Sequence, residues 1–401
     1  MRRKTRALPL LLALFLLTVG CRPAAGPATP APPASTPVPV TPTPTPEPDP
    51  VEEALSAMTT EEKVGQLLMA GFYGAQAGEE VRAYIQDLHV GGVILFGRNV
   101  ENAGQMVELT NGLKALAGDG IPLLIAADQE GGSVDRMPPE VHRLPNPYDA
   151  AGPAALGRAL GAECAAFGIN TDFAPSLDVW SNPDNTVIGR RAFGSDPETA
   201  AEGGTACAAA LMEAGVIAVG KHFPGHGDTG ADSHTDLPVV DKTREALLAE
   251  ELVPFQTAIL AGLPAVMMGH ILMTQIDPER PASLSPAVVT GLLREELGFD
   301  GVVVTDDLTM GAVTQNYGLG EAAVLAVEAG CDLLLVCHEA GSVEEVCQAL
   351  LAAAESGRLS QARLDQSVRR LLALKLDFGV NAEPVEPPDL EALNALVDAV
   401  G

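Results

Sequence analysis

Residues 301–307 read Gly-Val-Val-Val-Thr-Asp-Asp, a short apolar run that ends in two carboxylates. Runs of the same kind recur along the chain, at residues 67–72, 92–96, 123–127, 170–174, 216–220, 265–269, 302–305 and 332–336. They are apolar almost throughout and show no regular alternation with polar residues, so each predicts a strand that is buried on both faces. Such strands are typical of a parallel sheet that helices cover.

Amphipathic stretches separate these runs and predict helices, at residues 101–116, 198–214, 244–261 and 344–354. An earlier helix is expected over residues 60–66, because Thr59 and Glu62 have the spacing of a capping box. Two closing helices are expected over residues 361–374 and 389–399.

Eight strand–helix units predict an α/β fold, a (β/α)8 TIM barrel that forms one domain over residues 51–401. A doubly wound, Rossmann-like sheet is the alternative, and it is disfavoured because no G-x-G-x-x-G follows any apolar run. Barrel enzymes build their active sites from the loops after the strands. Polar residues gather in those loops, at residues 128–132, 221–227, 270 and 306–307.

The composition excludes one class of partner. The chain has 53 acidic and 24 basic residues, and its formal net charge is −29. Such a surface repels phosphate backbones, so no nucleic acid partner is expected. The six cysteines lack CxxC spacing, which argues against a zinc ribbon and a disulfide-dense scaffold. Five of them are expected to be small buried residues, namely Cys164, Cys207, Cys331, Cys337 and Cys347.

The first 21 residues predict a signal peptide, since basic residues precede a short apolar run at 7–19. A helix over that run would rise only ~20 Å, too short for a ~30 Å hydrocarbon core. Residues 17–21, Leu-Thr-Val-Gly-Cys, resemble a bacterial lipobox, although Thr18 stands where such motifs usually carry Leu. A lipid on Cys21 would anchor the exported protein at the outer face of a membrane, whereas an ordinary cleavage near Gly20 would release it.

Residues 22–50 contain twelve prolines and predict an extended linker. A stiff spacer of this kind after a lipidated cysteine would hold a domain away from the membrane surface. The linker and the lipobox-like motif therefore support each other.

Asp306 and Asp307 follow an apolar strand directly, where a carboxylate is held rigidly and can act as nucleophile, base or metal ligand. Asp307 could instead cap the following turn. In the loop at 221–234, a metal would need His222 and His226 on one helix face, which the intervening Pro and Gly prevent, so no metal is expected. Asp232 and His234 could pair in a local turn for proton transfer, or His234 could be a solvated loop residue.

Other polar side chains at the strand ends could bind a ligand. Lys221 and His222 could contact ligand hydroxyls, or Lys221 could pair with a carboxylate. Asp128 and Arg136 flank two glycines that let a ligand approach the backbone. The Arg191 guanidinium could donate several hydrogen bonds to a ligand, or it could form a surface ion pair. Structural roles are expected for Asp172, Asp178 and His270.

Four motifs carry a specific resemblance: D-Q-E-G-G from Asp128, K-H-F-P-G-H-G from Lys221, D-S-H from Asp232, and L-G-F-D-G-V-V-V-T-D-D-L-T-M from Leu297. Over residues 51–378 the chain resembles glycoside hydrolase family 3, and within it the β-N-acetylhexosaminidase branch. The resemblance implies a retaining mechanism through a covalent glycosyl–enzyme intermediate. It implies the following site residues: Asp306 as nucleophile, His234 as acid/base with Asp232 as its partner, and Asp128, Arg136, Arg191, Lys221 and His222 as sugar-binding residues.

The same resemblance implies an exo-acting, cofactor-free enzyme that releases terminal β-linked N-acetylglucosamine from cell-wall muropeptides or chitin-type oligosaccharides. We expect a monomer of the compact, single-domain type. Ser133 departs from the family pattern, because relatives often carry Arg there. Two alternatives stay open: phosphorolysis by the same site, and a non-catalytic, lipid-anchored sugar-binding protein.

Overall fold

The fold was analysed in a computed structural model, which describes Gly26, residues 49–230 and residues 237–400. The chain divides into two units, Met1–Glu47 and Pro48–Gly401, and the fold below is that of the second. Cys21 and nearly all of the expected signal peptide and linker lie outside the described residues. Within the described part, no helix combines the length and the apolar character needed to cross a bilayer.

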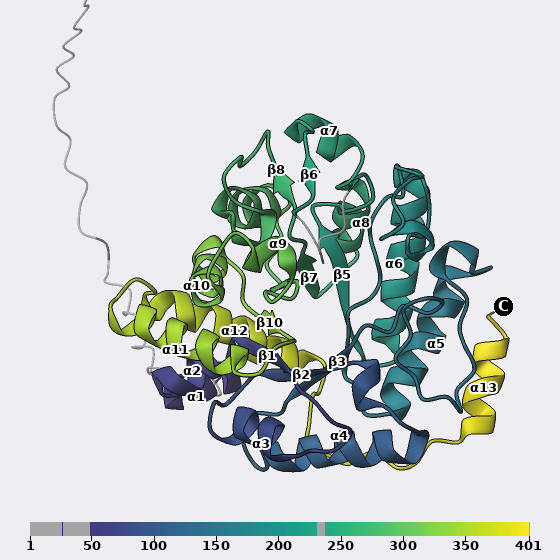
Figure 1. The fold of residues 1–401 in the computed structure, drawn as a ribbon, viewed down its shortest axis with the longest axis horizontal. Coiled ribbons are helices and arrows are strands. Elements are labelled where there is room, and N and C mark those ends of the chain that lie inside the picture. Colours follow the sequence, from purple (N-terminus) through teal and green to yellow (C-terminus); the bar gives the residue numbers. More distant parts are fainter. Residues whose placement is uncertain (1–25, 27–48, 231–236, 401) are drawn as a thin grey trace, which may run out of the picture. The chain divides into compact units, whose positions relative to one another are not determined.

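Parallel strands form the centre of the domain (Figure 1). In the described residues they make one eight-stranded sheet in the order β10, β1, β2, β3, β4, β5, β7, β9. Their bounds are β1 Leu68–Gly71, β2 Gly92–Leu95, β3 Leu124–Ala127, β4 Thr171–Asp172, β5 Ile217–Phe223, β7 Ala265–Met268, β9 Val302–Thr305 and β10 Leu334–Val336. A parallel bridge between Val304 and Leu333 brings the two ends of this sheet together. The predicted (β/α)8 barrel is confirmed, with one strand in each of the eight apolar runs, although β5 extends beyond its run to Phe223.

The strands are apolar on both faces because each face meets its own part of the core. In β9, Val302 and Val304 pack inside the barrel with residues such as Met69 and Phe173. Val303, between them, packs outward into the larger cluster under the helices. Successive side chains of a strand point to opposite faces, so both layers require apolar residues. This explains the unbroken apolar runs in the sequence.

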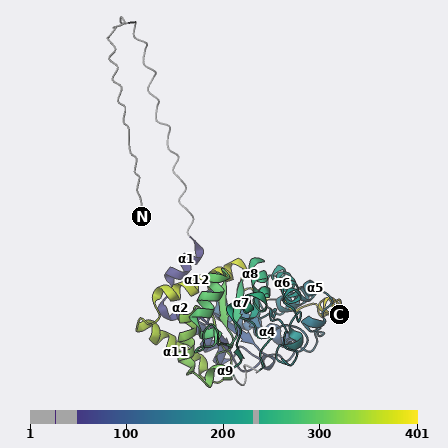
Figure 2. The same cartoon turned by 90° about the horizontal axis from the view of Figure 1, so that it is seen from above.

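Helices surround the strands (Figures 1 and 2). The longer ones are α1 Pro50–Ala57, α2 Thr60–Gln66, α3 Glu79–Gln86, α4 Ala103–Ala117, α5 Pro153–Ala166, α6 Pro197–Glu213, α7 Arg244–Ala249, α8 Val253–Leu260, the π-helical segment η5 Ala287–Glu296, α10 Leu319–Ala329, α11 Ser342–Glu355, α12 Gln361–Asp377 and α13 Leu390–Asp398. Short turns of helix are η1 Gly97–Asn99, η2 Pro147–Asp149, η3 Gly189–Arg191, η4 Ala282–Leu284 and α9 Gly311–Thr314.

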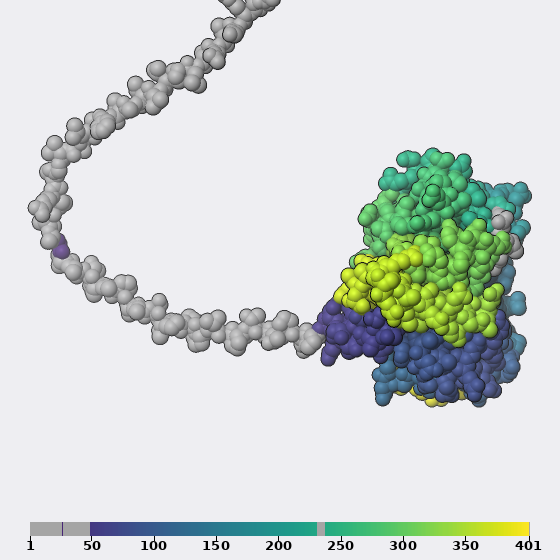
Figure 3. Space-filling model, turned by 60° about the vertical axis from the view of Figure 1, so that its left-hand side comes forward, coloured from purple at the N-terminus to yellow at the C-terminus, as the bar shows by residue number. Residues whose placement is uncertain are grey.

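The first and last parts of the domain pack together. The helices α1 and α2 lie against α12, and α2 also contacts α11, as the purple and yellow-green surfaces of Figure 3 show. The expected capping box holds the start of α2: the Thr59 hydroxyl accepts from the Glu62 N–H at 3.2 Å, and the Glu62 carboxylate accepts from the Thr59 N–H at 2.7 Å. The helix α13 packs beside α5 at another side of the barrel (Figure 1).

One feature differs from the sequence-based picture, and another agrees with it. A second small sheet pairs β6 Val239–Val240 with β8 Leu272–Met273, outside the barrel ring. The sequence did not predict it, because two-residue strands are too short to show a pattern. The five cysteines expected to be buried are buried and unpaired, which confirms that prediction.

Candidate active site

A cavity of about 390 Å³ lies at the carboxyl ends of the strands. Loops after β2, β3, β4, β5, β9 and β10 contribute to its wall. Six of the predicted site residues line it: Asp128, Arg136, Arg191, Lys221, His222 and Asp306. The other two, Asp232 and His234, lie outside the described residues.

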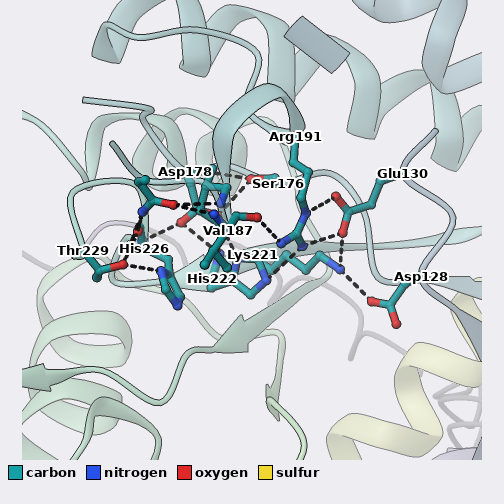
Figure 4. A network of polar contacts seen from close by, with 12 residues as sticks. Asp128, Glu130, Ser176, Asp178, Val187, Arg191, Lys221, His222, His226 and Thr229 are labelled. Carbon is teal, nitrogen blue, oxygen red and sulfur yellow. Dashed lines mark hydrogen bonds and ion pairs between the residues drawn. The ribbon is translucent and has the colours of Figure 1, made fainter. Parts of the chain in front are cut away.

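Lys221 lies at the centre of a buried charged cluster (Figure 4). Its ammonium group is 2.6 Å from Asp128 Oδ1 and 2.7 Å from Glu130 Oε1. Arg191 donates to both oxygens of Glu130, from Nε at 2.8 Å and from Nη2 at 2.7 Å. Burial alone would raise the pKa of Glu130, but Arg191 and Lys221 outweigh it and hold that pKa well below its usual range. The four charges are therefore fixed before any ligand binds.

These contacts decide between the alternative roles that the sequence left open for Lys221 and for Arg191. Lys221 pairs with carboxylates and also lines the cavity, so its two possible roles are compatible. Arg191 is not in a surface ion pair, because the carboxylate that it binds is 1% exposed. Glu130 was missed as a site residue. Its position in D-Q-E-G-G, two residues after Asp128, was the available signal.

Asp178, which is fully buried and does not line the cavity, orients His222 (Figure 4). Its Oδ2 is 2.7 Å from His222 Nδ1, and its Oδ1 accepts the backbone N–H of His226 at 2.7 Å. Burial raises the pKa of Asp178, but the His222 ring opposes this and the net pKa is lowered. An ionised Asp178 only accepts, so Nδ1 of His222 carries a proton and Nε2 is turned toward Arg191, 3.4 Å away. The structural role expected for Asp178 fits this contact.

Asp306 follows β9 and lines the same cavity. Its Oδ1 accepts the N–H of Asp307 at 2.8 Å. Burial raises the pKa of Asp306, but the nearby His270 and His222 outweigh it and lower the pKa overall. An ionised carboxylate on a rigid strand end is suited to attack an electrophilic carbon.

Asp307 closes the turn after β9, as one interpretation of the sequence expected. Its Oδ1 accepts the N–H groups of Thr309 and Cys337, each at 3.0 Å. Its Oδ2 accepts the Thr309 hydroxyl at 2.6 Å and lies 2.9 Å from Nδ1 of His338. Asp307 thus connects the loop after β9 to the loop after β10. His270 supports the same turn, with Nε2 3.0 Å from the Asp307 carbonyl oxygen.

Gln129 holds the loop after β3 in place. Its N–H donates to Asp172 Oδ1 at 2.9 Å, its side-chain amide donates to Glu163 Oε2 at 2.8 Å, and its Oε1 accepts the N–H of Arg136 at 2.6 Å. Burial raises the pKa of both Glu163 and Asp172 well above the usual range. The Nε of Arg136 is buried and has no hydrogen-bond partner among the described residues. A ligand oxygen in the cavity would satisfy that donor.

Two further expectations concern Ser133 and the absence of a metal site. Ser133 lies at an exposed turn, where its N–H donates to Asn146 Oδ1 at 3.1 Å. In the described part of the chain, no group of three or more His, Cys, Asp or Glu side chains could hold a metal ion.

The fold and the site together define a class: a barrel enzyme whose polar pocket contains a fixed carboxylate and a cluster of hydrogen-bonding charges. That arrangement suits the cleavage of glycosidic bonds. The family model "Glycosyl hydrolase family 3 N terminal domain" matches residues 59–374. The chain belongs to glycoside hydrolase family 3.

Two curated relatives illustrate the similarity. A beta-hexosaminidase of Alkalilimnicola ehrlichii is 40% identical over 295 residues, which is 71% of this chain and 84% of the relative. A beta-hexosaminidase of Nitrosomonas eutropha is 37% identical over 323 residues, which is 77% of this chain and 91% of the relative.

Solved structures agree with this assignment. The beta-N-acetylglucosaminidase of Paenibacillus sp. str. FPU-7 is 47% identical with a TM-score of 0.80, over 86% of this chain and 68% of that one. The beta-N-acetylhexosaminidase of Beutenbergia cavernae is 37% identical with a TM-score of 0.75, over 79% of this chain and 98% of that one. A beta-glucoside phosphorylase is 26% identical with a TM-score of 0.77, over 86% of this chain and 63% of that one. The predicted family, the barrel and the assignment as a glycoside hydrolase are confirmed.

Proposed function

We propose that the protein is an exo-acting β-N-acetylhexosaminidase that releases terminal β-linked N-acetylglucosamine with retention of configuration. The observation that carries the proposal is that an ionised Asp306 and a preformed charged cluster line one cavity. The relatives named beta-hexosaminidase and beta-N-acetylglucosaminidase support the choice of sugar.

Asp306 is the proposed nucleophile. It attacks the anomeric carbon, the bond to the leaving oxygen breaks, and a covalent glycosyl–enzyme forms. His234, paired with Asp232, gives a proton to the leaving oxygen and then takes one from the water that releases the sugar. His234 and Asp232 lie outside the described residues, so their roles rest on the D-S-H motif.

The charged cluster is the proposed site for the sugar hydroxyls. Lys221 and Arg191 present donors, and Asp128 and Nε2 of His222 present acceptors. Because Glu130 and Asp178 already hold these groups, little side-chain freedom is lost when the sugar binds. Arg136 adds the buried donor that lacks a partner among the described residues.

We further propose cell-wall muropeptides or chitin-type oligosaccharides as substrates, acted on by an exported protein that a lipid on Cys21 holds at the outer face of a membrane. The signal-like pattern of residues 1–21 and the proline-rich linker support this placement. Labelling with a radioactive fatty acid, abolished in Cys21→Ala, tests the anchor.

The first test is hydrolysis of 4-nitrophenyl N-acetyl-β-D-glucosaminide by the full chain. We expect nitrophenol release, and we expect Asp306→Ala to lower kcat by roughly 10³-fold or more. Asp300→Ala is the matched control, because Asp300 lies just before the same strand and its side chain is 93% exposed. Equal activity in wild type and Asp306→Ala would reject Asp306 as the nucleophile.

The same assay separates the alternatives. His234→Ala should fail mainly on substrates with poor leaving groups, since nitrophenolate departs with little protonation. The phosphorylase among the similar structures makes phosphorolysis the second candidate. Formation of N-acetylglucosamine 1-phosphate in added phosphate would favour it. A folded wild type that binds N-acetylglucosamine but releases no nitrophenol would instead be a sugar-binding protein.

A further inference from the structure

A second cavity, of about 860 Å³, lies at the end of the barrel opposite the candidate active site. Gln66, Val90 and Leu123 line it, and they precede β1, β2 and β3, so the cavity is at the amino ends of these strands. Active sites of barrel enzymes lie at the carboxyl ends. The proposed mechanism therefore makes no use of this cavity, although its volume is in the range of small-molecule sites.

Most of the lining of this amino-end cavity is apolar. The helix α1 contributes Val51 and Ala54, and α12 contributes Leu372 and Leu376. The apolar lining reaches the surface of the protein at Leu376, which is 55% exposed. An alkyl chain could therefore enter the cavity from solvent and lie along these side chains, because burying its methylene groups away from water is favourable.

Lys375, in α12, places an amino group in this apolar cavity. Lys375 is 4% exposed, and its Nζ donates to Gln66 Oε1 at 2.8 Å and to the Gly91 carbonyl oxygen at 2.9 Å. Both acceptors are neutral, whereas the buried Lys63 and Lys221 each bind a carboxylate. Burial lowers the pKa of Lys375 to about 7. Its ammonium form has three N–H donors, one more than these two acceptors use.

The two carboxylates that line the cavity leave this ammonium group without a counter-charge. Asp119 is exposed, and Glu62 is half-buried and accepts the N–H of Thr59 at 2.7 Å. Among the described residues, neither forms an ion pair with Lys375. A buried cation without an anion is costly, and a bound carboxylate would offset that cost.

We propose that the amino-end cavity binds an aliphatic carboxylate, such as a free fatty acid, with its head group on Lys375 and its chain along the apolar walls toward Leu376. Charge complementarity selects the head group, because Lys375 is the buried charged residue of the described lining. The apolar walls select the chain. This inference goes beyond the proposed function and does not depend on it, because the cavity and Asp306 lie at opposite ends of the barrel.

The test is isothermal titration calorimetry of the full chain with octanoate at pH 6, where the ligand is ionised and Lys375 is mostly protonated. The ligand 1-octanol has the same chain length without the charge, and propionate has the same charge on a shorter chain. Each is titrated into the wild type and into Lys375→Met, whose unbranched side chain fills similar space without the ammonium group. Lys114→Met is the matched control, because Lys114 is buried and donates to the Glu383 carbonyl oxygen at 3.0 Å, outside this cavity.

We expect octanoate to bind the wild type and Lys114→Met equally, and 1-octanol and propionate to bind the wild type at least tenfold more weakly. Lys375→Met should weaken octanoate binding at least tenfold and change 1-octanol binding less than threefold. Circular dichroism checks that the variants are folded, and the comparison of ligands on the wild type needs no variant.

Three results would overturn the inference: no binding of octanoate, equal binding of octanoate and 1-octanol by the wild type, or undiminished octanoate binding by a folded Lys375→Met. Failure of the proposed function is distinguishable from these results, because it would appear in the nitrophenyl assay, where no octanoate is present.

Discussion

At the scale of single residues, the site depends on carboxylates that never need to touch the substrate. Glu130 binds both Lys221 and Arg191, and Asp178 binds His222. Each holds a positive or polar group that lines the cavity, and both carboxylates are themselves buried. The cost of removing such an anion is high, because its partners remain buried without compensation.

We therefore expect Glu130→Gln to lower the free energy of unfolding by about 3–5 kcal/mol, the usual cost of breaking a buried ion pair. Urea unfolding followed by circular dichroism measures this. The control is Glu321→Gln: Glu321 also pairs with an arginine, Arg358 at 2.7 Å, but is 51% exposed. Such a surface pair contributes about 1 kcal/mol or less. Similar losses in the two variants would contradict the buried cluster.

Sequence patterns pointed to Lys221 and Asp306 because strand ends in a barrel converge on one face, whereas Arg191 was assigned to the site through the family resemblance. They did not identify Glu163 or His338 as parts of the site. Glu163 is a carboxylate inside a helical pattern, and its contact with Gln129 joins residues 34 positions apart. His338 is positioned by Asp307, which follows another strand, and by the ring of Phe96. Contacts of this kind depend on packing between elements, which spacing along one element does not encode.

At the scale of elements, the loops after β4 and β5 support each other. Asn185 donates to the carbonyl oxygen of His226 at 2.8 Å, and Asp178 accepts the N–H of the same residue. Gly227 allows this approach: a Cβ there would lie 1.8 Å from the carbonyl oxygen of Val179. The two loops could not keep these contacts around a larger residue.

We expect Gly227→Ala to separate the loops and to cost about 1–3 kcal/mol, as overpacking usually does. The turnover of the nitrophenyl substrate should fall as well, since the contacts of His226 shift with the loop. Thermal melting and steady-state kinetics provide the measurements. Gly230→Ala is the control, because among the described residues a Cβ at Gly230 meets nothing within 4 Å. A Gly227→Ala variant that matched Gly230→Ala in both measurements would show that the loops are not tightly packed.

The elements themselves were largely predictable. Each of the eight apolar runs contains a strand because both faces of a barrel strand are buried, and this produces a continuous signal. The extents were less predictable: only Thr171–Asp172 is regular strand in the fourth run, whereas β5 extends to Phe223, past the apolar run and into Lys221 and His222. Polar residues in a strand look like loop in the sequence.

At the scale of the whole molecule, stability should depend on pH through Glu163. Its pKa in the folded protein is raised well above its ordinary value of 4.5 by burial. The stabilisation from a protonated Glu163 is complete below about pH 4.5 and is lost as the pH rises toward the folded-state pKa.

Glu163→Gln keeps the shape and the acceptor for Gln129 but cannot ionise. We expect its unfolding free energy, relative to wild type, to increase as the pH is raised from 5 to 8. Urea unfolding at both pH values checks this. A difference between the two proteins that stays constant across this range would mean that Glu163 is already ionised in the fold.

The pairing of β1 with β10 has a consequence for how the domain folds during its synthesis. Leu68 lies beside Leu334, so the first strand waits for a partner that is translated more than 260 residues later. On the ribosome, the other edge of β1 stays uncovered until almost the entire domain has been made. The ring can close only near the end of synthesis, and a chain truncated before residue 334 exposes two strand edges that invite association with other chains.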